Sequence, residues 1–366
     1  TKLMSSKKDK FTRKDRFYMN LAINLAKGHD GFTGLNPSVG CVIVKNKKII
    51  SHAVTNINGR PHAETIALNK NKKKNIGSTV YLTLEPCTHY GKTPPCTNII
   101  AKKKIKDVYY TFEDPDVRTY KQAKKILNKK KINLKKINCQ KNNIYKSYFF
   151  NKKYNLPFID AKIAISKDFF TINKKNRWIT NIKSRRLAQY IRSKYDCIIS
   201  TSETINKDNS LLNCRLNGFD NNKPDLIIID RNLKLKKKLK LFKIAKTRKT
   251  YLVTLKKNTK KLNYFNKKKI SIIKIDELDN KKDFFYLLKK LFDYGKRRIL
   301  IETGLIFLNK MIKYKLINDL FIFKSGKNLK IDGYNNSKPN YLKKYKLKNK
   351  IKVNLDNDTL FKVSAN

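Results

Sequence analysis

Two short segments of the chain contain residue types that together could bind a metal ion and move protons. The first is Pro61-His62-Ala63-Glu64, and the second runs from Pro86-Cys87 to Pro95-Cys96. One imidazole and two thiolates supply the three protein ligands that are typical of a catalytic zinc site, which keeps a further position open for water. We therefore predict that zinc is held by His62, Cys87 and Cys96.

Glu64 lies just beyond His62, at the start of a predicted helix over 62–68. This offset brings its carboxylate near the metal without making it a ligand, so Glu64 is the predicted catalytic acid and base. A histidine or a cysteine alone is more often a core residue. The joint occurrence with a glutamate at this offset, and with a strand leading into Pro86-Cys87, favours the catalytic interpretation. A His-x-Glu segment followed by Pro-Cys is typical of zinc nucleobase deaminases.

The elements that would position these residues alternate between helices and strands. In the first half, helices are predicted over 16–26, 62–68, 97–103 and 120–127, and strands over 41–44, 49–54, 80–84 and 107–111. In the second half, strands are predicted over 158–165, 197–201, 226–229, 250–254, 270–275, 298–302 and 320–323, and helices over 184–192, 283–294 and 305–314. The strands over 41–44 and 49–54 are expected to pair as a hairpin. In the second half, near-continuous apolar strands separated by helices indicate a largely parallel sheet. The alternation is typical of sheets covered by helices on both faces. A polar stretch over 151–156 separates the two series, so domains are predicted at 1–150 and 151–366.

The charge of the chain raises the question of a nucleic-acid partner. Its 366 residues include 86 Lys and Arg against 27 Asp and Glu, a formal net charge of +59. A nucleic-acid footprint is usually clustered on one face. Here the lysines are spread along the whole chain between apolar strands, which favours a base-composition bias in the source genome. No specific nucleic-acid partner is therefore expected.

The sequence also bears on location. Six cysteines are too few and too scattered for a disulfide framework in a chain of this length. The apolar runs, such as 226–229, are far shorter than the about 20 residues that cross a bilayer. The start of the chain, over 1–14, is polar and basic and has no apolar h-region, so no secretory signal is expected. We predict a cytoplasmic protein without a membrane partner, and leave a homo-oligomer open.

The spacing of the two cysteines narrows the family. Nucleoside and nucleic-acid deaminases generally have Cys-x-x-Cys, whereas eight residues separate Cys87 from Cys96 here. With the segments 36–44, 62–64 and 83–96, the sequence resembles the bifunctional enzymes of riboflavin biosynthesis, in which a pyrimidine deaminase is fused to a reductase. Further similar segments are 162–168, 178–180, 204–215, 229–230 and 301–304, so that the resemblance covers nearly the whole chain.

This resemblance implies a fold and two reactions. The fold is α/β, with an N-terminal three-layer cytidine-deaminase-like domain and a C-terminal dihydrofolate-reductase-like domain. The first domain would use zinc to deaminate a phosphorylated pyrimidine, 2,5-diamino-6-(5-phosphoribosylamino)pyrimidin-4-one. The second would use NADPH to reduce the ribosyl group to a ribityl chain. No Gly-x-Gly-x-x-Gly follows a strand, so a Rossmann-type site is not expected.

The resemblance also implies binding residues, carried over by position. The predicted NADPH contacts are Ala164, Trp178, Thr204, Asp208, Gly304, Leu305, Ile306, Phe307, Leu308, Asn309 and Lys310. The predicted substrate contacts are Asn176, Arg192, Leu212, Arg215 and Glu302, together with Asn36 in the first domain. Free N–H groups at the start of the helix after Gly304 suit cofactor phosphates, and Arg192 and Arg215 suit a substrate phosphate.

Several positions depart from the family pattern. Thr55 stands where a histidine is common, and 116–119 leads into a helix where Asn-Pro and glycines are usual. Phe169-Phe170 replaces Gly-Arg, and Leu305 stands where a proline or a small residue is common. Bulky residues where a cofactor approaches the backbone would weaken its binding. A deaminase with a decayed reductase domain therefore competes with the bifunctional enzyme as an interpretation.

Two competing hypotheses assign the chain to different classes of protein. A nucleic-acid base deaminase is motivated by the net charge, but it predicts Cys-x-x-Cys spacing and an RNA-reading appendage, and neither is seen in the sequence. A non-enzymatic zinc module would need a fourth protein ligand to close the site, and no such residue lies at motif spacing.

Overall fold

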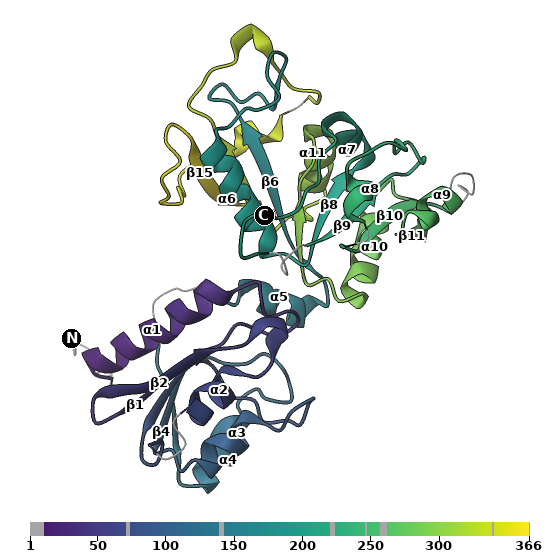
Figure 1. Cartoon of the computed structure of the whole chain (residues 1–366). Helices are drawn as coiled ribbons and strands as arrows, with labels where there is room; N and C mark the ends of the chain where they lie inside the picture. The colour runs from purple at the N-terminus through teal and green to yellow at the C-terminus, as the bar shows by residue number, and fades with distance from the viewer. Residues whose placement is uncertain are drawn as a thin grey trace, which may run out of the picture. The chain divides into compact units, whose positions relative to one another are not determined.

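The computed structural model describes residues 11–70, 74–138, 143–219, 224–245, 247–256, 262–338 and 340–365. The chain divides into two compact units, Thr1–Lys153 and Tyr154–Asn366 (Figure 1). Residues 1–10 of the polar start lie outside the described ranges. Among the helices of the described residues, none combines the length and the apolar character that crossing a membrane requires.

The first unit is built on a five-stranded mixed sheet with the order β2-β1-β3-β4-β5. β1 and β2 form the predicted antiparallel hairpin, β1 also runs antiparallel to β3, and β3, β4 and β5 are parallel. The carboxyl ends of β3 and β4 therefore lie at one edge of the sheet, and the segment with Cys87 begins there. The strands are β1 (Gly40–Lys45), β2 (Lys48–Val54), β3 (Thr79–Leu84), β4 (Asp107–Phe112) and β5 (Asn133–Lys136).

Helices cover both faces of this sheet, as predicted. Because side chains alternate along a strand, Cys41 and Ile43 face one layer of helices while Val42 and Val44 face the other. α1 packs on the second face, and α2, α3 and α4 pack on the first. This confirms the three-layer arrangement. The helices are α1 (Arg13–His29), α2 (Ala63–Lys70), α3 (Cys96–Lys102), α4 (Gln122–Lys129) and α5 (Lys146–Tyr154), with a 3-10 turn at Ile57–Gly59.

The second unit contains an eight-stranded sheet with the order β11-β10-β9-β8-β12-β6-β13-β15. All neighbouring strands are parallel except β13 and β15, which confirms the predicted, largely parallel sheet. The strands are β6 (Phe158–Ile165), β8 (Cys197–Thr201), β9 (Asp225–Ile229), β10 (Thr250–Leu255), β11 (Ile270–Ile275), β12 (Arg298–Ile301), β13 (Asp319–Lys324) and β15 (Thr359–Ser364). A small separate ladder pairs β7 (Ile172–Asn173) with β14 (Gly333–Tyr334).

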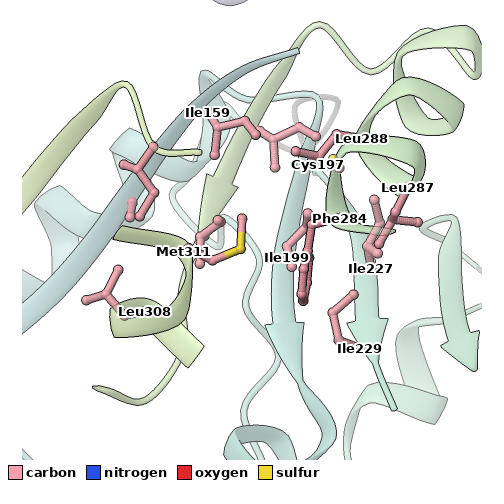
Figure 2. Packing of buried hydrophobic residues seen from close by; sticks show 14 of the residues in the cluster. Ile159, Cys197, Ile199, Ile227, Ile229, Phe284, Leu287, Leu288, Leu308 and Met311 are labelled. Carbon is pink, nitrogen blue, oxygen red and sulfur yellow. The ribbon is translucent and has the colours of Figure 1, made fainter. Parts of the chain in front are cut away.

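Two apolar clusters lie on opposite faces of this larger sheet. Figure 2 shows one of them, where Phe284 and Leu287 of α10 and Met311 of α11 pack against Ile199 and Ile227 of the central strands. The other cluster holds α6, α7, α8 and α9. The helices are α6 (Ile182–Ser193), α7 (Ser202–Asp208), α8 (Leu241–Ile244), α9 (Leu262–Lys267), α10 (Lys281–Asp293) and α11 (Leu305–Lys313), with 3-10 turns at Lys330–Asp332 and Tyr341–Lys344.

Several elements were not predicted from the sequence, namely β5, α5, β7, α7, α8, α9, β14 and β15. They are short, so an apolar periodicity has few residues over which to appear. In β5, for example, Leu134 is the buried residue and its neighbours are exposed. Pairing with β4 makes this segment a strand. α5 also extends into the polar stretch over 151–156, from which the domain boundary was inferred.

Candidate functional site

Three residues that are distant in the sequence meet in the first unit. Nδ1 of His62 lies 3.3 Å from Sγ of Cys96 and 3.7 Å from Sγ of Cys87. The ligand atoms of these residues all lie within 4.8 Å of one another. One imidazole and two thiolates form a donor set that suits zinc, with a ligand position left over for catalysis. The residues present therefore fit the metal that the sequence predicted.

The local structure explains how the three side chains converge. Cys87 follows the end of β3, His62 directly precedes α2, and Cys96 is the first residue of α3. The backbone N–H of Cys96 donates to Sγ of Cys87 at 3.2 Å, which connects the two ends of the intervening loop. The side-chain hydrogen bond with Cys96 lowers the pKa of the Cys87 thiol most, burial opposes this, and His62 and the backbone N–H of Cys96 lower the pKa further. This favours the thiolate, the form that binds a metal.

Glu64 is in the first turn of α2 and is buried. Burial raises the pKa of its carboxyl above the ordinary value, while the neighbouring His62 acts in the opposite direction. Its Oε2 atom has no hydrogen-bond partner among the residues that the structure describes. A buried carboxylate oxygen without a partner is costly, and such groups are characteristic of functional sites. The arrangement can exchange protons with a molecule bound beside the cysteines.

Asn36 holds the loop that leads to His62. Its Nδ2 donates to the carbonyl of Gly59 at 2.9 Å. Gly59 has a φ of 86°, and a Cβ atom there would lie 2.6 Å from the carbonyl oxygen of Thr33 and 2.7 Å from Nδ2 of Asn36. Only glycine fits this turn. The structure thus places Asn36 near the site as a support of the backbone, and its contact with substrate remains a prediction.

Thr55, which replaces a histidine of the family pattern, is part of the framework. Its buried hydroxyl accepts a hydrogen bond from the N–H of Val39 at 2.9 Å and donates to the carbonyl of the same residue at 3.4 Å. The threonine therefore closes the end of the β1–β2 pair.

Sequence reasoning gave no role to three residues that hold the loop between the cysteines. The carboxylate of Glu85 accepts backbone N–H groups from Asp114, Lys121 and Ala123 at 3.4, 3.1 and 3.4 Å. Thr88 Oγ1 donates to the carbonyl of Arg118 at 2.7 Å, and Nδ1 of His89 lies 3.1 Å from Oγ1 of Thr119. The loop after β3 is thus tied to the loop after β4. The position of Glu85 in the matched segment 83–96 was the available signal.

In the second unit, Glu302 follows β12 and forms a buried ionic cluster. Its carboxylate accepts Nε and Nη2 of Arg192 at 2.5 and 2.9 Å and lies 3.0 Å from Nζ of Lys162. Burial alone would raise the pKa of Glu302, but the charges of Arg192 and Lys162 lower it to about 2. Lys162 lies in a matched segment, and sequence reasoning gave it no role.

The predicted substrate residues of the second unit occupy different surroundings. Arg192 donates from Nε and Nη2 to the carboxylate of Glu302, and from Nη1 to the carbonyl of Asn213 at 3.3 Å. Arg215 is exposed, with Nη1 2.6 Å from Oδ1 of Asn213. Leu212 is buried. Contact of any of these with substrate remains a prediction. Arg215 is the more exposed of the two arginines.

Two further predicted contacts lie on the exposed loop after β7. The guanidinium carbons of Arg177 and Arg185 lie 4.8 and 4.5 Å from the centroid of the Trp178 ring. Trp178 is 48% exposed, so part of its ring is accessible to a ligand. Oδ1 of Asn176 accepts the backbone N–H of Trp178 at 3.0 Å and so shapes this loop.

The predicted cofactor contacts gather around the start of α11. The backbone N–H of Gly304 donates to Oγ1 of Thr204 at 3.2 Å, and Gly304 caps the helix without a side-chain hydrogen bond. A Cβ atom on Gly304 would make ordinary van der Waals contact with Nδ2 of Asn336 and Oγ1 of Thr204, each 3.8 Å away. The free N–H groups of such an uncapped helix start fit a cofactor phosphate.

The remaining predicted cofactor residues divide between this region and the core. The side chains of Leu305 and Leu308 are fully buried, so at these positions only the backbone can meet a cofactor. Ala164 is half-buried on β6, and Asp208 ends α7. In the rest of the stretch, Ile306 is exposed, Phe307 packs against the core cluster and Asn309 is buried. Nζ of Lys310 lies 5.2 Å from the centroid of the Phe284 ring.

The bulky side chains of Phe169 and Phe170 pack against neighbouring residues of the second unit. The ring of Phe170 lies against Gly333, and Phe169 packs on the core cluster with Nζ of Lys324 4.5 Å from its centroid. Both aromatic rings therefore have packing partners within the second unit.

Comparison with known proteins gives the family. The family described as the cytidine and deoxycytidylate deaminase zinc-binding region matches residues 12–112, and that described as the RibD C-terminal domain matches residues 157–327. The riboflavin biosynthesis protein RibD of Buchnera aphidicola subsp. Baizongia pistaciae is 35% identical over 327 residues, which cover 85% of this chain and 86% of that protein. The chain belongs to the RibD family.

Solved structures agree over both units. Acinetobacter baumannii RibD has a TM-score of 0.81 at 26% identity, covering 96% of this chain and 98% of that one. The diaminohydroxyphosphoribosylaminopyrimidine deaminase/5-amino-6-(5-phosphoribosylamino)uracil reductase of Thermotoga maritima has a TM-score of 0.79 at 26% identity, covering 95% and 98%. The protein is thus a bifunctional deaminase and reductase of riboflavin biosynthesis. The hypotheses of a decayed reductase domain and of a nucleic-acid base deaminase are set aside, because both halves match this family.

Proposed function

We propose that the first unit binds zinc through His62, Cys87 and Cys96, and that it deaminates 2,5-diamino-6-(5-phosphoribosylamino)pyrimidin-4-one. The second unit then reduces the ribosyl group of the product with NADPH. The observation that carries the first assignment is the convergence of the three ligand atoms within 4.8 Å, beside a buried carboxyl group. The zinc supplies Lewis-acid activation of water.

Glu64 does the proton work of the deamination. Its unpartnered Oε2 takes a proton from the attacking water and delivers it to the departing amine. Burial, which raises the pKa of Glu64, brings that pKa closer to the working pH and makes both directions of transfer efficient. Glu85, Thr88 and His89 hold the surrounding loop, and we expect Asn36 to contact the pyrimidine.

In the reductase, the chain binds and orients two anionic molecules. NADPH supplies the hydride. The uncapped N–H groups at the start of α11, with Gly304 and Thr204, hold its phosphates, and the exposed part of the Trp178 ring lies against the nicotinamide or ribose. Arg215 holds the substrate phosphate. The ionic cluster of Arg192, Glu302 and Lys162 forms the polar wall of the substrate site.

The test is to assay the purified chain for both products by mass spectrometry and to measure its metal content. Glu64→Gln keeps the shape of the side chain and removes its base, so ammonia release should fall by about 10²–10⁴-fold while zinc content stays stoichiometric. Glu113→Gln is the matched control, because Glu113 pairs with Lys136 at 3.4 Å in the same unit. Absence of zinc, or full activity of Glu64→Gln, would refute the proposal.

The cellular location and the binding partners of the enzyme remain predictions. We expect a cytoplasmic enzyme that acts on its free pyrimidine nucleotide and has no specific nucleic-acid partner. Its positive charge should still attract anionic substrates electrostatically. A homo-oligomer is left to measurement by light scattering.

A further inference from the structure

The segment Gly333–Ser337, here called the strap, is fixed at one side to the loop that leads to Trp178. Its first residues, as β14, pair antiparallel with β7. Oδ1 of Asn335 accepts both the N–H and the hydroxyl of Thr171 at 2.9 and 2.8 Å, and Nδ2 of Asn335 donates to the carbonyl of Phe169 at 3.1 Å. The strap is therefore bonded to this loop at several points.

Other contacts fix the strap to the helices that carry predicted cofactor residues. Oγ of Ser337 accepts Nδ2 of Asn309 in α11 at 3.0 Å. The Tyr334 hydroxyl accepts Nζ of Lys207 in α7 at 3.1 Å. A Cβ atom on Gly333 would lie 2.3 Å from the ring of Phe170, so the close packing at this end requires glycine. The strap thus joins three elements around one site.

Asn336 lies between these anchors, beside the start of α11. A Cβ atom on Gly304 would be 3.8 Å from Nδ2 of Asn336 and 3.8 Å from Oγ1 of Thr204. The two polar groups therefore flank Gly304 at the uncapped helix start. Asn336 is exposed, and its amide makes no hydrogen bond to any residue of the described ranges. Its neighbours Asn335 and Ser337 already hydrogen-bond to Thr171 and Asn309, so within this described segment the amide of Asn336 can donate to a ligand beside the start of α11.

We propose that Asn336 is a cofactor-contacting residue of the reductase, whose Nδ2–H donates to a phosphate oxygen of NADPH in front of Gly304. The inference rests on the proposed cofactor site. The start of α11 has no side-chain cap, and Nδ2 of Asn336 lies beside it, so both can donate to one anion at this position. A neutral amide that donates to an anionic oxygen makes a charge-assisted hydrogen bond. Asn335 and Ser337 act as positioning residues.

The experiment measures equilibrium binding of NADPH to the full chain. Two readouts are used, quenching of the single tryptophan and the fluorescence of NADPH itself. Asn336→Ala should raise the Kd by about tenfold, the effect of one hydrogen bond to a charged group. Asn336→Asp should raise it further, because a carboxylate repels the phosphate. Asn349→Ala and Asn349→Asp, at an exposed position of the same unit, repeat the changes in size and charge and should leave the Kd unchanged.

Separate outcomes identify which part of the reasoning fails. If the unmodified chain does not bind NADPH, the proposed reductase site is wrong and the inference falls with it. If the unmodified chain binds but both Asn336 variants bind within about twofold of it, only the role of Asn336 is refuted. A weaker Kd with an equal loss of thermal stability in Asn336→Ala would also refute it, since the residue would then be structural. Unchanged melting and deamination with weakened NADPH binding would support it.

Discussion

Replacing Glu302 with glutamine would remove the negative charge that Arg192 and Lys162 share inside the second unit. Both cations are largely buried, with side-chain exposures of 12% and 18%, and Glu302 is 5% exposed. Glutamine keeps the size of the side chain and can still meet Arg192 through one oxygen. The substitution therefore tests charge rather than packing.

The magnitude follows from the shift in pKa. Lowering the pKa of Glu302 from 4.5 to about 2 corresponds to about 3 kcal/mol of folding free energy. Because the folded-state pKa lies below the unfolded one, this contribution is complete above about pH 4.5 and is lost as the pH falls towards about 2. At about pH 3, about 2 kcal/mol of it is gone. Leaving the two cations unpaired at neutral pH should cost about 3–5 kcal/mol.

The assay is urea unfolding followed by the fluorescence of Trp178, the single tryptophan, which reports on the second unit. Glu302→Gln should be less stable than the unmodified chain by about 3–5 kcal/mol at neutral pH, and the gap should narrow by about 2 kcal/mol near pH 3. Glu277→Gln, at an exposed position of the same unit, controls for the loss of one acidic group.

Further carboxylates also titrate in this pH range, so the quantity of interest is the difference between the two proteins at each pH. A gap that stays constant from neutral to acidic pH would refute the assignment of a lowered pKa to Glu302. A variant as stable as the unmodified chain at neutral pH would refute the claim that Arg192 and Lys162 depend on this carboxylate.

Three further predictions concern the first unit. Gly59→Ala should lower its stability by about 1–3 kcal/mol and lower zinc content, because the Cβ atom would clash with Thr33, whereas Gly77→Ala, at a φ of 73° with nothing within 4 Å, should show the smaller backbone cost alone. Tyr145→Phe should cost about 1 kcal/mol in thermal unfolding monitored by circular dichroism, because the hydroxyl donates to the carbonyl of Ser38 at 2.9 Å in the buried core. Removing zinc with a chelator should abolish deamination but leave NADPH oxidation with pre-deaminated substrate unchanged. The reason is that, among the described residues, the cluster of His and Cys ligands lies in the first unit. Loss of both activities would contradict this prediction.

The metal-site residues could be recognised from the sequence because the chemistry is carried by rare residue types at short spacing. His62 and Glu64 share one segment, and Cys87 and Cys96 share another, so few long-range contacts had to be inferred. The burial of Glu64 and its unpartnered oxygen could not be inferred, because both depend on how α2 packs on the sheet. Zinc binding itself remains to be measured.

The long strands of the second unit could also be predicted from the sequence, because near-continuous apolar runs such as 158–165 and 270–275 have few other interpretations. The short elements were not. β15 is a strand because it pairs with β13, and its own sequence alternates only weakly. The family resemblance named Arg192 and Glu302, and the structure adds Lys162 as their partner, which β6 brings beside the end of β12.

By itself, the sequence determined which residues could hold a metal, that helices and strands alternate in both halves, and which family the chain resembles. These properties depend on residue types and on local periodicity. Only the tertiary structure decided that the side chains of Asn36 and Thr55 form hydrogen bonds with backbone groups. It also decided that Arg192 donates to the carboxylate of Glu302, and that Asn336 lies beside the start of α11. Each of these depends on which strands and loops become neighbours, and burial then sets the cost of leaving a polar group unpaired.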